Sequence, residues 1–291
     1  MIGTEARLYE RAAVNARDFD SLWHVDEGRT FYAGPLPFCA SHQHGAPVFL
    51  AGLYGRFKLR LPGGDWLSCR TAMVPAGGLH ELDTGGDPIA VFYIEPHVAG
   101  AHAFAPLMTS SREVNGSLVG SGGEISFFRD LYEDRASAKW AGLALNEIVS
   151  FSRRRAPKEI DPRISRAVEA MYERCGDLTP VAQIAGAAGL SASRFQHLFT
   201  EQTGVPFRRY RAWNRTRAAI CEIVSGSNFT TAAHAAGYSD QAHFAHDFRK
   251  TFGAAATYSL SNVRGAPSPG REKMYPPASR SLNSPMKSVS L

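Results

Sequence analysis

Three histidines in the first third of the chain have the residue type and the spacing to bind a ligand. His42 and His44 are separated by one residue, so on a strand both imidazoles would point to the same face. His80 ends the run Pro75-Ala76-Gly77-Gly78-Leu79-His80 and would lie on a neighbouring strand. Three converging imidazoles could hold a divalent metal ion with open coordination positions. They could equally line a polar small-molecule pocket or make internal hydrogen bonds, and the residues alone leave these alternatives open.

Two stretches of the C-terminal half repeat one another at an offset of 49 residues. The coinciding residues are Phe195, Phe199 and Gly204 in the first copy and Phe244, Phe248 and Gly253 in the second. Each copy predicts a short helix, a tight turn that Gly189 or Gly237 would allow, and a longer helix that ends at the last glycine. Ser191 and Asp240 stand where an N-cap oxygen would start the longer helix. Two helix-turn-helix units are therefore predicted.

The polar face of each longer helix is a candidate for reading DNA. If the phenylalanines face the core, helix geometry places a set of hydrogen-bonding side chains on the opposite face. These are Ser193, Gln196 and His197 in the first copy, with Arg194 at the edge of the face, and Gln241 and His246 in the second, with His243 at the edge. Such side chains suit base edges in the major groove. An ordinary solvated helix face is the alternative for a single copy, and the repetition favours DNA reading.

One long helix is predicted over residues 206–224, between the two copies. Its apolar positions recur at helical spacing, and its five arginines could meet phosphates or lie in solvent. The arginines are Arg208, Arg209, Arg211, Arg215 and Arg217. A rigid helix of this kind would hold the two reading helices in successive major grooves, about 34 Å apart.

The C-terminal region resembles the AraC/XylS family of transcription regulators over about 100 residues. The matching residues in the first copy and the linking helix are Ile184, Ala185, Gly189, Leu190, Ser191, Phe195, Leu198, Phe199, Gly204, Phe207, Tyr210, Arg215 and Ala219. In the second copy they are Ala235, Gly237, Tyr238, Asp240, Gln241, His243, Phe244, Phe248, Arg249, Lys250 and Gly253. The resemblance implies a bipartite DNA site read through the seven polar positions named above, with Arg215 as a further DNA-binding position.

The second copy departs from the family pattern at four positions. His234 replaces the usual Ile, Ala242 a frequent Ser, His246 a frequent Arg, and Ala256 the Pro after the last glycine. A buried imidazole without a partner would be costly, so we expect His234 to reach the surface or a hydrogen-bond partner. Without Arg at position 246, the second unit should read DNA more weakly than the first.

Residues 30–95 predict a small β-barrel. Short β-type segments separated by Gly and Pro turns occur at 47–53, 55–61, 71–78 and 88–96, which is typical of an all-β sandwich or barrel. With the three histidines, this region resembles a cupin, the barrel that serves many AraC/XylS regulators as effector domain. Metal-binding cupins carry a Glu four or five residues after the second His, where this chain has Val48 and Phe49. We therefore expect His42, His44 and His80 to bind an effector, with no resident cofactor and with a divalent metal as the alternative.

The expected fold is α+β, with a cupin-like sensor domain over residues 1–105 and a double helix-turn-helix domain over 158–261. Apolar residues at helical spacing from Glu124 predict a helical connector over 106–157, which could serve dimerisation, and the run Arg153–Pro157 reads as a linker. Residues 262–291, rich in Ser, Pro and basic residues, are expected to form a disordered tail. Six aromatic residues of the barrel could line a pocket or belong to its core: Trp23, Phe31, Tyr32, Trp66, Phe92 and Tyr93.

Composition limits the class of protein. The 291 residues include no apolar run long enough for a membrane span and no N-terminal secretory signal, and the four cysteines are scattered, so we expect a cytoplasmic protein without a disulfide framework. The net charge is −2 over residues 1–157, +3 over 158–261 and +4 over 262–291. This asymmetry favours contact of the C-terminal half with a polyanion.

These observations predict a transcription regulator that is controlled by a small-molecule effector and is not an enzyme. The expected partners are double-stranded DNA, an unidentified effector, a second copy of the chain in a homodimer and RNA polymerase. A metal-dependent cupin enzyme fused to a DNA-binding domain is the first alternative. A barrel that serves only dimerisation is the second.

Overall fold

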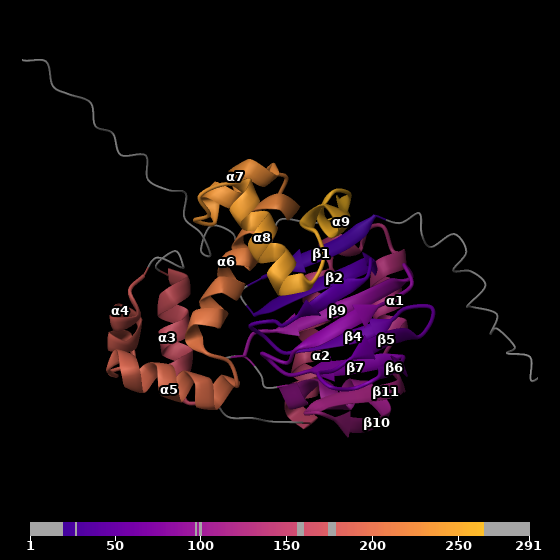
Figure 1. Cartoon of the computed structure of the whole chain (residues 1–291), viewed down its shortest axis with the longest axis horizontal. Coiled ribbons are helices and arrows are strands. Elements are labelled where there is room, and N and C mark those ends of the chain that lie inside the picture. Colours follow the sequence, from indigo (N-terminus) through magenta and orange to yellow (C-terminus); the bar gives the residue numbers. More distant parts are fainter. Residues whose placement is uncertain are drawn as a thin grey trace, which may run out of the picture.

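The protein is described by a computed structural model, which covers residues 20–26, 28–96, 98, 101–155, 160–173 and 179–264. A β-rich N-terminal half carries a helical C-terminal half on one side (Figure 1). Within the residue ranges just given, the β-rich part consists of two sheets, of eight and four strands. In pairing order, the larger sheet contains β10 (Met108–Val114), β11 (Ser117–Gly123), β7 (Thr71–Val74), β4 (Val48–Gly52), β9 (Pro88–Ile94), β2 (Arg29–Pro35), β1 (Ser21–Val25) and β12 (Val263–Arg264). The smaller contains β3 (Cys39–His42), β8 (His80–Asp83), β5 (Phe57–Arg60) and β6 (Trp66–Cys69).

The central strands of the larger sheet are buried on both faces. In β4, Val48 and Leu50 belong to the cluster of side chains that fills the barrel, while Phe49 and Ala51 belong to a second cluster outside it. This alternation follows the two-residue repeat of a strand. Both faces are apolar because helices cover the outer one, which explains why these strands read as nearly continuous apolar segments.

The second cluster is closed by the helices that follow the barrel. The 3-10 helices η2 (Ala101–Leu107) and η3 (Ser137–Lys139), and the α-helices α1 (Ser126–Glu133) and α2 (Ala141–Arg155), supply its outer layer. Two parts of the predicted connector require correction. Residues 108–123 form β10 and β11 of the sheet, so the barrel extends beyond residue 105. The run Arg153–Arg155, read as a linker, is the last turn of α2, since three arginines are good helix formers.

Seven helices form most of the described part of the C-terminal half. They are α3 (Pro162–Glu173), α4 (Val181–Ala187), α5 (Ala192–Thr203), α6 (Phe207–Val224), α7 (Phe229–Ala235), α8 (Gln241–Phe252) and α9 (Ala256–Leu260). The first helix-turn-helix unit, α4 and α5 with α3 beside them, lies at one end of α6, and the second unit, α7 and α8, lies at the other (Figure 1). The linking helix predicted over 206–224 is thus α6, and the expected α+β class with two helix-turn-helix units is confirmed.

The predicted helix starts, turns and stops are present in both units. The Ser191 hydroxyl accepts from the Arg194 amide at 3.3 Å, and the Asp240 carboxylate accepts from the His243 amide at 2.7 Å. Gly189 and Gly237 have φ of 67° and 79°, in the left-handed region that favours glycine. The longer helices end in the same region of φ, at the glycines that follow Thr203 and Phe252.

The two halves are joined by a contact between sheet and helices. The chain returns to the barrel at its end, where β12 pairs in parallel with β1. The Trp23 indole donates to the Ser259 carbonyl at 2.7 Å. One cluster of buried side chains runs from the barrel interior into the core of both helix-turn-helix units. The tail predicted over 262–291 therefore begins too early, because Val263 and Arg264 form β12 of the larger sheet, and the residues after Arg264 lie outside the described residues.

Two further expectations concern the described part of the chain. No helix within it is long and apolar enough to cross a membrane. Cys39, Cys69 and Cys221 are buried free thiols, while Cys175 lies outside the described residues.

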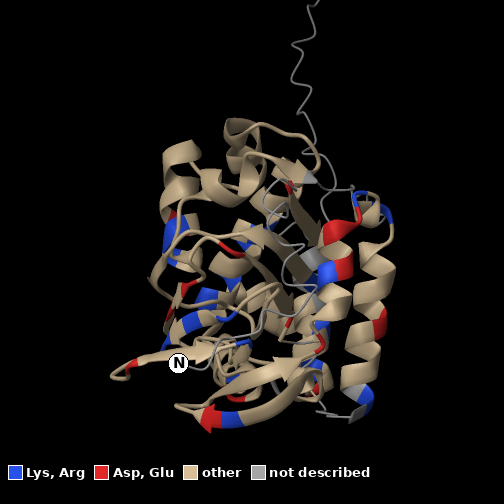
Figure 2. Cartoon of the chain, turned by 90° about the vertical axis from the view of Figure 1, so that its right-hand side faces the viewer, with Lys and Arg blue, Asp and Glu red and all other residues tan. Residues whose placement is uncertain are grey.

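Basic and acidic residues occur together on the strands and helices of the barrel side (Figure 2).

Candidate functional site

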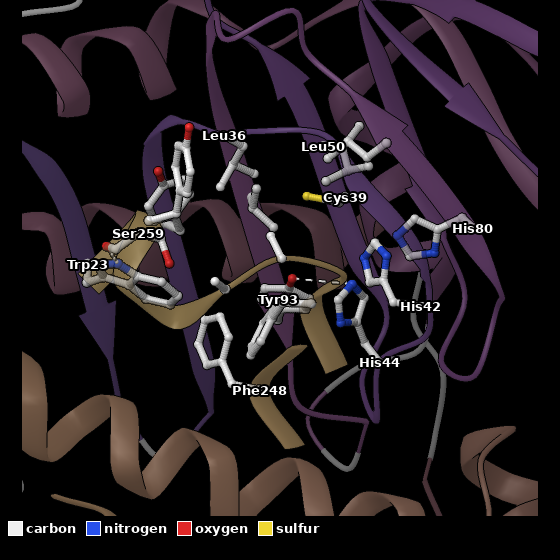
Figure 3. Close-up of a pocket in the computed structure, with 17 residues that line it drawn as sticks. Trp23, Leu36, Cys39, His42, His44, Leu50, His80, Tyr93, Phe248 and Ser259 are labelled. Carbon is white, nitrogen blue, oxygen red and sulfur yellow. Dashed lines mark hydrogen bonds between the residues drawn. The ribbon is translucent and has the colours of Figure 1, made fainter. Parts of the chain in front are cut away.

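A pocket lies where the barrel meets the second helix-turn-helix unit. The cavity is small, about 40 Å³. Its lining comes from both halves of the chain. The barrel contributes Trp23, Tyr32, Leu36, Cys39, His42, His44, Leu50, His80, Leu82, Val91 and Tyr93, and the C-terminal half contributes Phe248, Phe252, Ala254, Ala255, Tyr258 and Ser259. The end of α8, the turn after it and α9 therefore close the mouth of the barrel (Figure 3).

The three predicted histidines meet at one end of this pocket (Figure 3). His42 ends β3 and pairs with His80 on β8, whereas His44 lies in the loop after β3 rather than on the strand. The ring centroids are 4.3 Å apart for His42 and His80, 4.8 Å for His42 and His44, and 5.2 Å for His44 and His80. Each ring contributes one nitrogen atom to a group of three that all lie within 4.8 Å of one another. The prediction that they converge is thus supported by the geometry.

Backbone carbonyls orient two of the rings. His42 Nδ1 lies 2.7 Å from the Ala40 carbonyl oxygen, and His80 Nδ1 lies 3.0 Å from the Gly78 carbonyl oxygen. Because a carbonyl oxygen only accepts, each Nδ1 carries the proton and each Nε2 keeps its lone pair. His44 Nε2 lies 3.4 Å from the Tyr93 hydroxyl, and its Nδ1 is buried without a hydrogen-bond partner among the described residues.

Burial keeps the three imidazoles neutral near pH 7. Removal from water lowers the pKa of His42 to about 3 and that of His80 to about 4. The pKa of His44 falls well below its ordinary value for the same reason, and the two neighbouring imidazoles lower it further. Burial also raises the pKa of the Cys39 thiol to about 12, so this side chain is protonated. The pocket therefore offers neutral nitrogen donors and no charged group: none of the described lining residues is Asp, Glu, Lys or Arg.

The six aromatic residues considered for the pocket divide three ways. Trp23, Tyr32 and Tyr93 line it. Phe31 and Phe92 point to the opposite side of the larger sheet, into the cluster beneath α1 and α2. Trp66 is exposed on the smaller sheet. Successive residues of a strand point to opposite faces of the sheet, so Tyr32 and Tyr93 face the pocket while their neighbours Phe31 and Phe92 face away from it.

The predicted reading face of α5 is open to solvent. Ser193, Arg194, Gln196 and His197 are all exposed, and Phe195 and Phe199 are buried on the opposite face. The first unit thus presents four polar side chains together on one helix, at the end of the molecule far from β1 and β2 (Figure 1).

The reading face of α8 is partly engaged inside its own unit. Gln241 and His246 are exposed, and Gln241 accepts from the Thr230 hydroxyl at 3.0 Å. His243 is half-buried, with its Nδ1 3.1 Å from the Ser239 hydroxyl and its ring against Tyr238. The second unit therefore has fewer free polar groups than the first. His234 is exposed, as we expected from the cost of burying it.

Arg215 and Arg217, predicted as phosphate or solvent contacts, are held within the protein. Arg215 donates to the Asp247 carboxylate at 2.7 Å and lies over the Tyr238 ring at 4.4 Å, so it joins α6 to α8. Arg217 is buried at the barrel, which corrects its assignment to the surface. DNA contact by Arg215 stays a prediction, and its packing favours a positioning role.

A buried polar network that the sequence analysis missed joins α6 to the barrel. Arg217 Nη1 lies 3.1 Å from Glu95 Oε1, and Arg217 Nε donates to the Thr30 hydroxyl at 2.7 Å. The Trp213 indole also donates to Glu95, at 2.9 Å. The sequence does contain one indication of this network. Arg217 falls within the apolar stripe of α6, where a buried charged residue must find a partner.

Comparisons with known proteins agree with this architecture. Residues 184–258 match a family described as a helix-turn-helix domain. An apo form of ToxT from Vibrio cholerae, carrying a single substitution, is similar at a TM-score of 0.53 and 14% identity, over 81% of this chain and 98% of that one. Unsaturated-fatty-acid-bound wild-type ToxT from Vibrio cholerae is similar at a TM-score of 0.52 and 13% identity, over 84% and 98%. At such identities the likeness concerns the fold, and no curated protein matches the sequence.

Proposed function

We propose that this chain, whose C-terminal region is an AraC-type pair of helix-turn-helix units, is a sequence-specific DNA-binding transcription regulator controlled by a small effector bound in its barrel. The observation that carries effector control is the shared pocket, because Phe248, Phe252 and Tyr258 of the second DNA-binding unit line the same cavity as His42 and His44 of the barrel. An occupant of the cavity would touch both halves at once.

The DNA-binding part rests on the two units and their polar faces. Each unit has the capped reading helix and the glycine turn that a helix-turn-helix requires, and α6 fixes the units to one another. The first unit exposes Arg194 and Gln196, whose side chains can form bidentate bonds with guanine and adenine. We propose that α5 supplies more of the specificity than α8, where His243 is packed against its own unit.

Closure of the pocket by α8 suggests how control would work. In this arrangement α8 is held to the barrel by a hydrogen bond from the Ala40 amide to the Gly253 carbonyl, 3.0 Å long. Orientation of α8 relative to α5 decides whether both can enter successive major grooves. An effector that changes the contact between β3 and α8 would therefore change the affinity of the chain for a bipartite DNA site. The size of this change is set by how much more tightly the effector binds the chain with α8 released from β3 than with α8 held to it, or the reverse.

The size and chemistry of the pocket restrict the effector. ToxT, which has this fold, has been solved with an unsaturated fatty acid. Here the cavity of about 40 Å³ has room for two or three waters, far less than the roughly 300 Å³ or more of a drug-sized ligand site. No described lining residue carries the positive charge that would pair with a carboxylate. A small neutral ligand or a metal ion fits this arrangement better than a long fatty acid.

Selection of DNA sites with the full chain tests the proposal. The expected result is enrichment of a bipartite motif with half-sites about one helical turn apart, bound in a salt-sensitive manner. A chain carrying both Gln196→Ala and Arg194→Ala should lose one half of the motif. Absence of enriched sites at low salt, with a protein that is folded by circular dichroism, would contradict DNA reading.

Two partners follow from the proposed role. We propose that the chain forms a homodimer through the outer side of α2, where Leu143 is 75% exposed although its neighbours Ala141 and Leu145 are buried against the sheet. Light scattering of the wild type and of Leu143→Glu would show a dimer that the variant lacks. We further propose that the promoter-bound protein contacts RNA polymerase, which in-vitro transcription with purified polymerase would test.

The enzyme alternative has weaker support in the pocket. The Cys39 thiol is protonated, the pKa of the Tyr93 hydroxyl is raised well above its ordinary value by burial, and no described carboxylate lines the cavity. A general acid or base works best with a pKa near the working pH. The pocket is therefore better suited to binding than to proton transfer.

A further inference from the structure

We propose that a second cavity, on the outer side of the smaller sheet, binds an α-amino acid with an apolar side chain. This outer cavity lies where the turn after β5 meets the start of β8 and the strand β3, and its volume is about 310 Å³. Small-molecule sites begin at roughly 300 Å³, so the outer cavity has the size that the inner pocket of about 40 Å³ lacks. The site can exist whether or not the chain binds DNA, because the reading helices contribute nothing to its lining.

The polar side of the outer cavity contains an ion pair that is fixed in place. Arg60 on β5 and Glu81 on β8 lie opposite one another in the ladder, and the Arg60 guanidinium donates to the Glu81 carboxylate. Both point outward, because their neighbours Leu59 and Leu82 point into the barrel. The Arg60 Cζ also lies 4.8 Å from the centroid of the Trp66 ring, which stacks on the guanidinium. A cation and an anion are thus held side by side at the wall of the cavity, with 41% and 19% of their side chains exposed.

The apolar side of the outer cavity lies beyond the ion pair, at one end of the smaller sheet. Because β5 and β8 are antiparallel, the residues after Arg60 and those before Glu81 meet at the same end of the two strands. The apolar lining residues there are Leu61, Pro62 and Leu79. Leu79 is 41% exposed, so its side chain is available to an occupant. The cavity therefore has both charges on one side and apolar side chains on the other.

A free α-amino acid has the same division of polarity. Its carboxylate can form two parallel hydrogen bonds with the Arg60 guanidinium, and its ammonium group can donate to Glu81 and to the Ser41 hydroxyl, which also line the cavity. One ion pair is then replaced by two, so both charges of the wall keep a partner. An apolar side chain on the α-carbon would extend toward Pro62 and Leu79.

Other classes of small molecule match the outer cavity less well. Among the described lining residues the charge is carried by Arg60 and Glu81, and burial keeps His80 neutral by lowering its pKa to about 4, so the lining has no net charge. A carboxylic acid without an amine would take Arg60 from Glu81 and place two carboxylates side by side, where they repel one another. A sugar or another polyol carries hydroxyl groups on all sides, and some of them would meet Leu61 and Leu79 instead of water.

His80 separates the outer cavity from the inner pocket, since it lines both. Its imidazole is buried, is oriented by the Gly78 carbonyl and lies beside His42 at the end of the inner pocket (Figure 3). An occupant of the outer cavity would therefore change the surroundings of this ring. The NMR resonances of the His80 ring thus report occupation here and distinguish it from binding at a remote place on the surface.

Calorimetric titration of the full chain with L-leucine tests the class of ligand. We expect one leucine per chain, with a Kd on the order of 1 mM or tighter because the ion pair is partly exposed. L-leucinamide lacks the carboxylate, N-acetyl-L-leucine lacks the ammonium group and glycine lacks the apolar side chain, so each should bind at least about tenfold more weakly. Binding of N-acetyl-L-leucine or of inositol as tightly as leucine would overturn the class of ligand. A chain that binds neither leucine nor valine nor phenylalanine would overturn the site.

Variants of the smaller sheet locate the bound amino acid. Arg60→Gln and Glu81→Gln should each weaken leucine binding at least about tenfold and reduce the shift of the His80 resonances. Lys58→Gln is the matched control, because Lys58 and Asp83 form the neighbouring ion pair, 4.0 Å apart, on the same two strands but outside the lining. It should bind leucine as the wild type does, and equal binding by all three variants would overturn the outer cavity as the site. If one variant fails to fold by circular dichroism, the other variant and the wild-type series of leucine analogues decide the outcome.

Discussion

Glu95 and Arg217 form an ion pair that is closed off from water between β9 and α6. The Oε1 and Nη1 atoms are 3.1 Å apart, and the two side chains are 0% and 2% exposed. Each charge has further partners, since Trp213 donates to Glu95 and Arg217 donates to Thr30 and to the carbonyls of Asp26 and Arg29. The pair ties the helix that carries both DNA-binding units to the sensor barrel.

Removal of one member of this pair should destabilise the whole chain. Arg217→Met leaves Glu95 as a buried uncompensated charge, and breaking a buried pair in this way costs about 3–5 kcal/mol. Denaturant unfolding should show a loss of this size. The control Arg208→Met, at an exposed position of the same helix, should cost less than about 0.5 kcal/mol. Adding Glu95→Gln to Arg217→Met should restore part of the loss, and a double variant no more stable than the single one would contradict the pairing.

The stability of the barrel should fall in mild acid. The folded-state pKa values of about 3 for His42 and about 4 for His80 lie below the ordinary value of 6.5. Between pH 6.5 and the folded-state pKa of each imidazole, the unfolded chain binds more protons than the folded one. The free energy of unfolding therefore decreases as the pH falls through this range, by at most about 1.4 kcal/mol per imidazole and pH unit. Unfolding of the protein at a series of pH values measures the slope. His42→Gln should reduce the slope, and an unchanged slope would show that other groups are responsible.

Arg215 should matter for stability rather than for the choice of DNA sequence. It holds α8 to α6 through Asp247 and packs on Tyr238, and both interactions are partly exposed. Arg215→Gln should therefore lower the free energy of unfolding by about 1 kcal/mol and leave the selected DNA motif unchanged. Arg215→Lys keeps the charge but lacks the flat guanidinium, so it should restore only part of the loss. A changed motif in Arg215→Gln would instead show that this side chain contacts a base.

Local rules predicted the double helix-turn-helix because each feature lies within a few residues of its cause. Ser191 and Asp240 cap the helices that they precede, and the glycines at both helix ends have the positive φ that the pattern required. The convergence of His42 and His80 also followed from the short distance between paired strands, whereas His44 reaches them from the loop after β3. In contrast, the sequence predicts a helical connector where β10 and β11 lie, since six exposed or half-buried residues leave β10 without apolar alternation.

The contact between the two halves could not be predicted from the sequence. Glu95 and Arg217 are far apart along the chain, and nothing local indicates that they meet. The same holds for Phe248, which the sequence places on the inner face of a helix-turn-helix unit and which, together with Phe252, also closes the pocket of the barrel. Contacts between residues this far apart in sequence depend on how the barrel and the helical half pack together. The spacing of residues within either half does not determine that packing.

The two glutamines on the reading helices should contribute to base choice. Gln196 is exposed on α5, and its amide has no hydrogen-bond partner within the described part of the chain, whereas Gln241 on α8 accepts from Thr230 and keeps its NH2 group for DNA. Loss of a bidentate contact with adenine costs about 1–3 kcal/mol of discrimination. Gln196→Ala and Gln241→Ala should therefore each relax the selected motif in a different half-site. Lys250→Ala, an exposed control in the last turn of α8, should leave both half-sites unchanged, and a motif that survives both glutamine variants would contradict these reading positions.

Gly204 and Gly253 form a natural pair for testing the contact between α8 and the barrel. Both end a reading helix, with φ of 78° and 74°, so alanine at either position carries the same left-handed backbone cost of about 1–2 kcal/mol. Their surroundings differ. A Cβ at Gly204 has Ala76 O at 4.0 Å as its nearest neighbour, whereas a Cβ at Gly253 would lie 2.4 Å from Ala40 O and 2.7 Å from His42 Nδ1.

Gly253→Ala should therefore separate α8 from β3, and Gly204→Ala should not. The clash is with backbone and with a buried ring, which cannot move aside without opening the pocket, so Gly253→Ala should lose at least about 1 kcal/mol more stability than Gly204→Ala. If the barrel restrains the second unit, Gly253→Ala should also change the affinity for the selected DNA site. Both variants are compared by denaturant unfolding and by DNA titration. Equal losses of stability and equal affinities for the site would mean that α8 does not depend on its contact with His42 and Ala40.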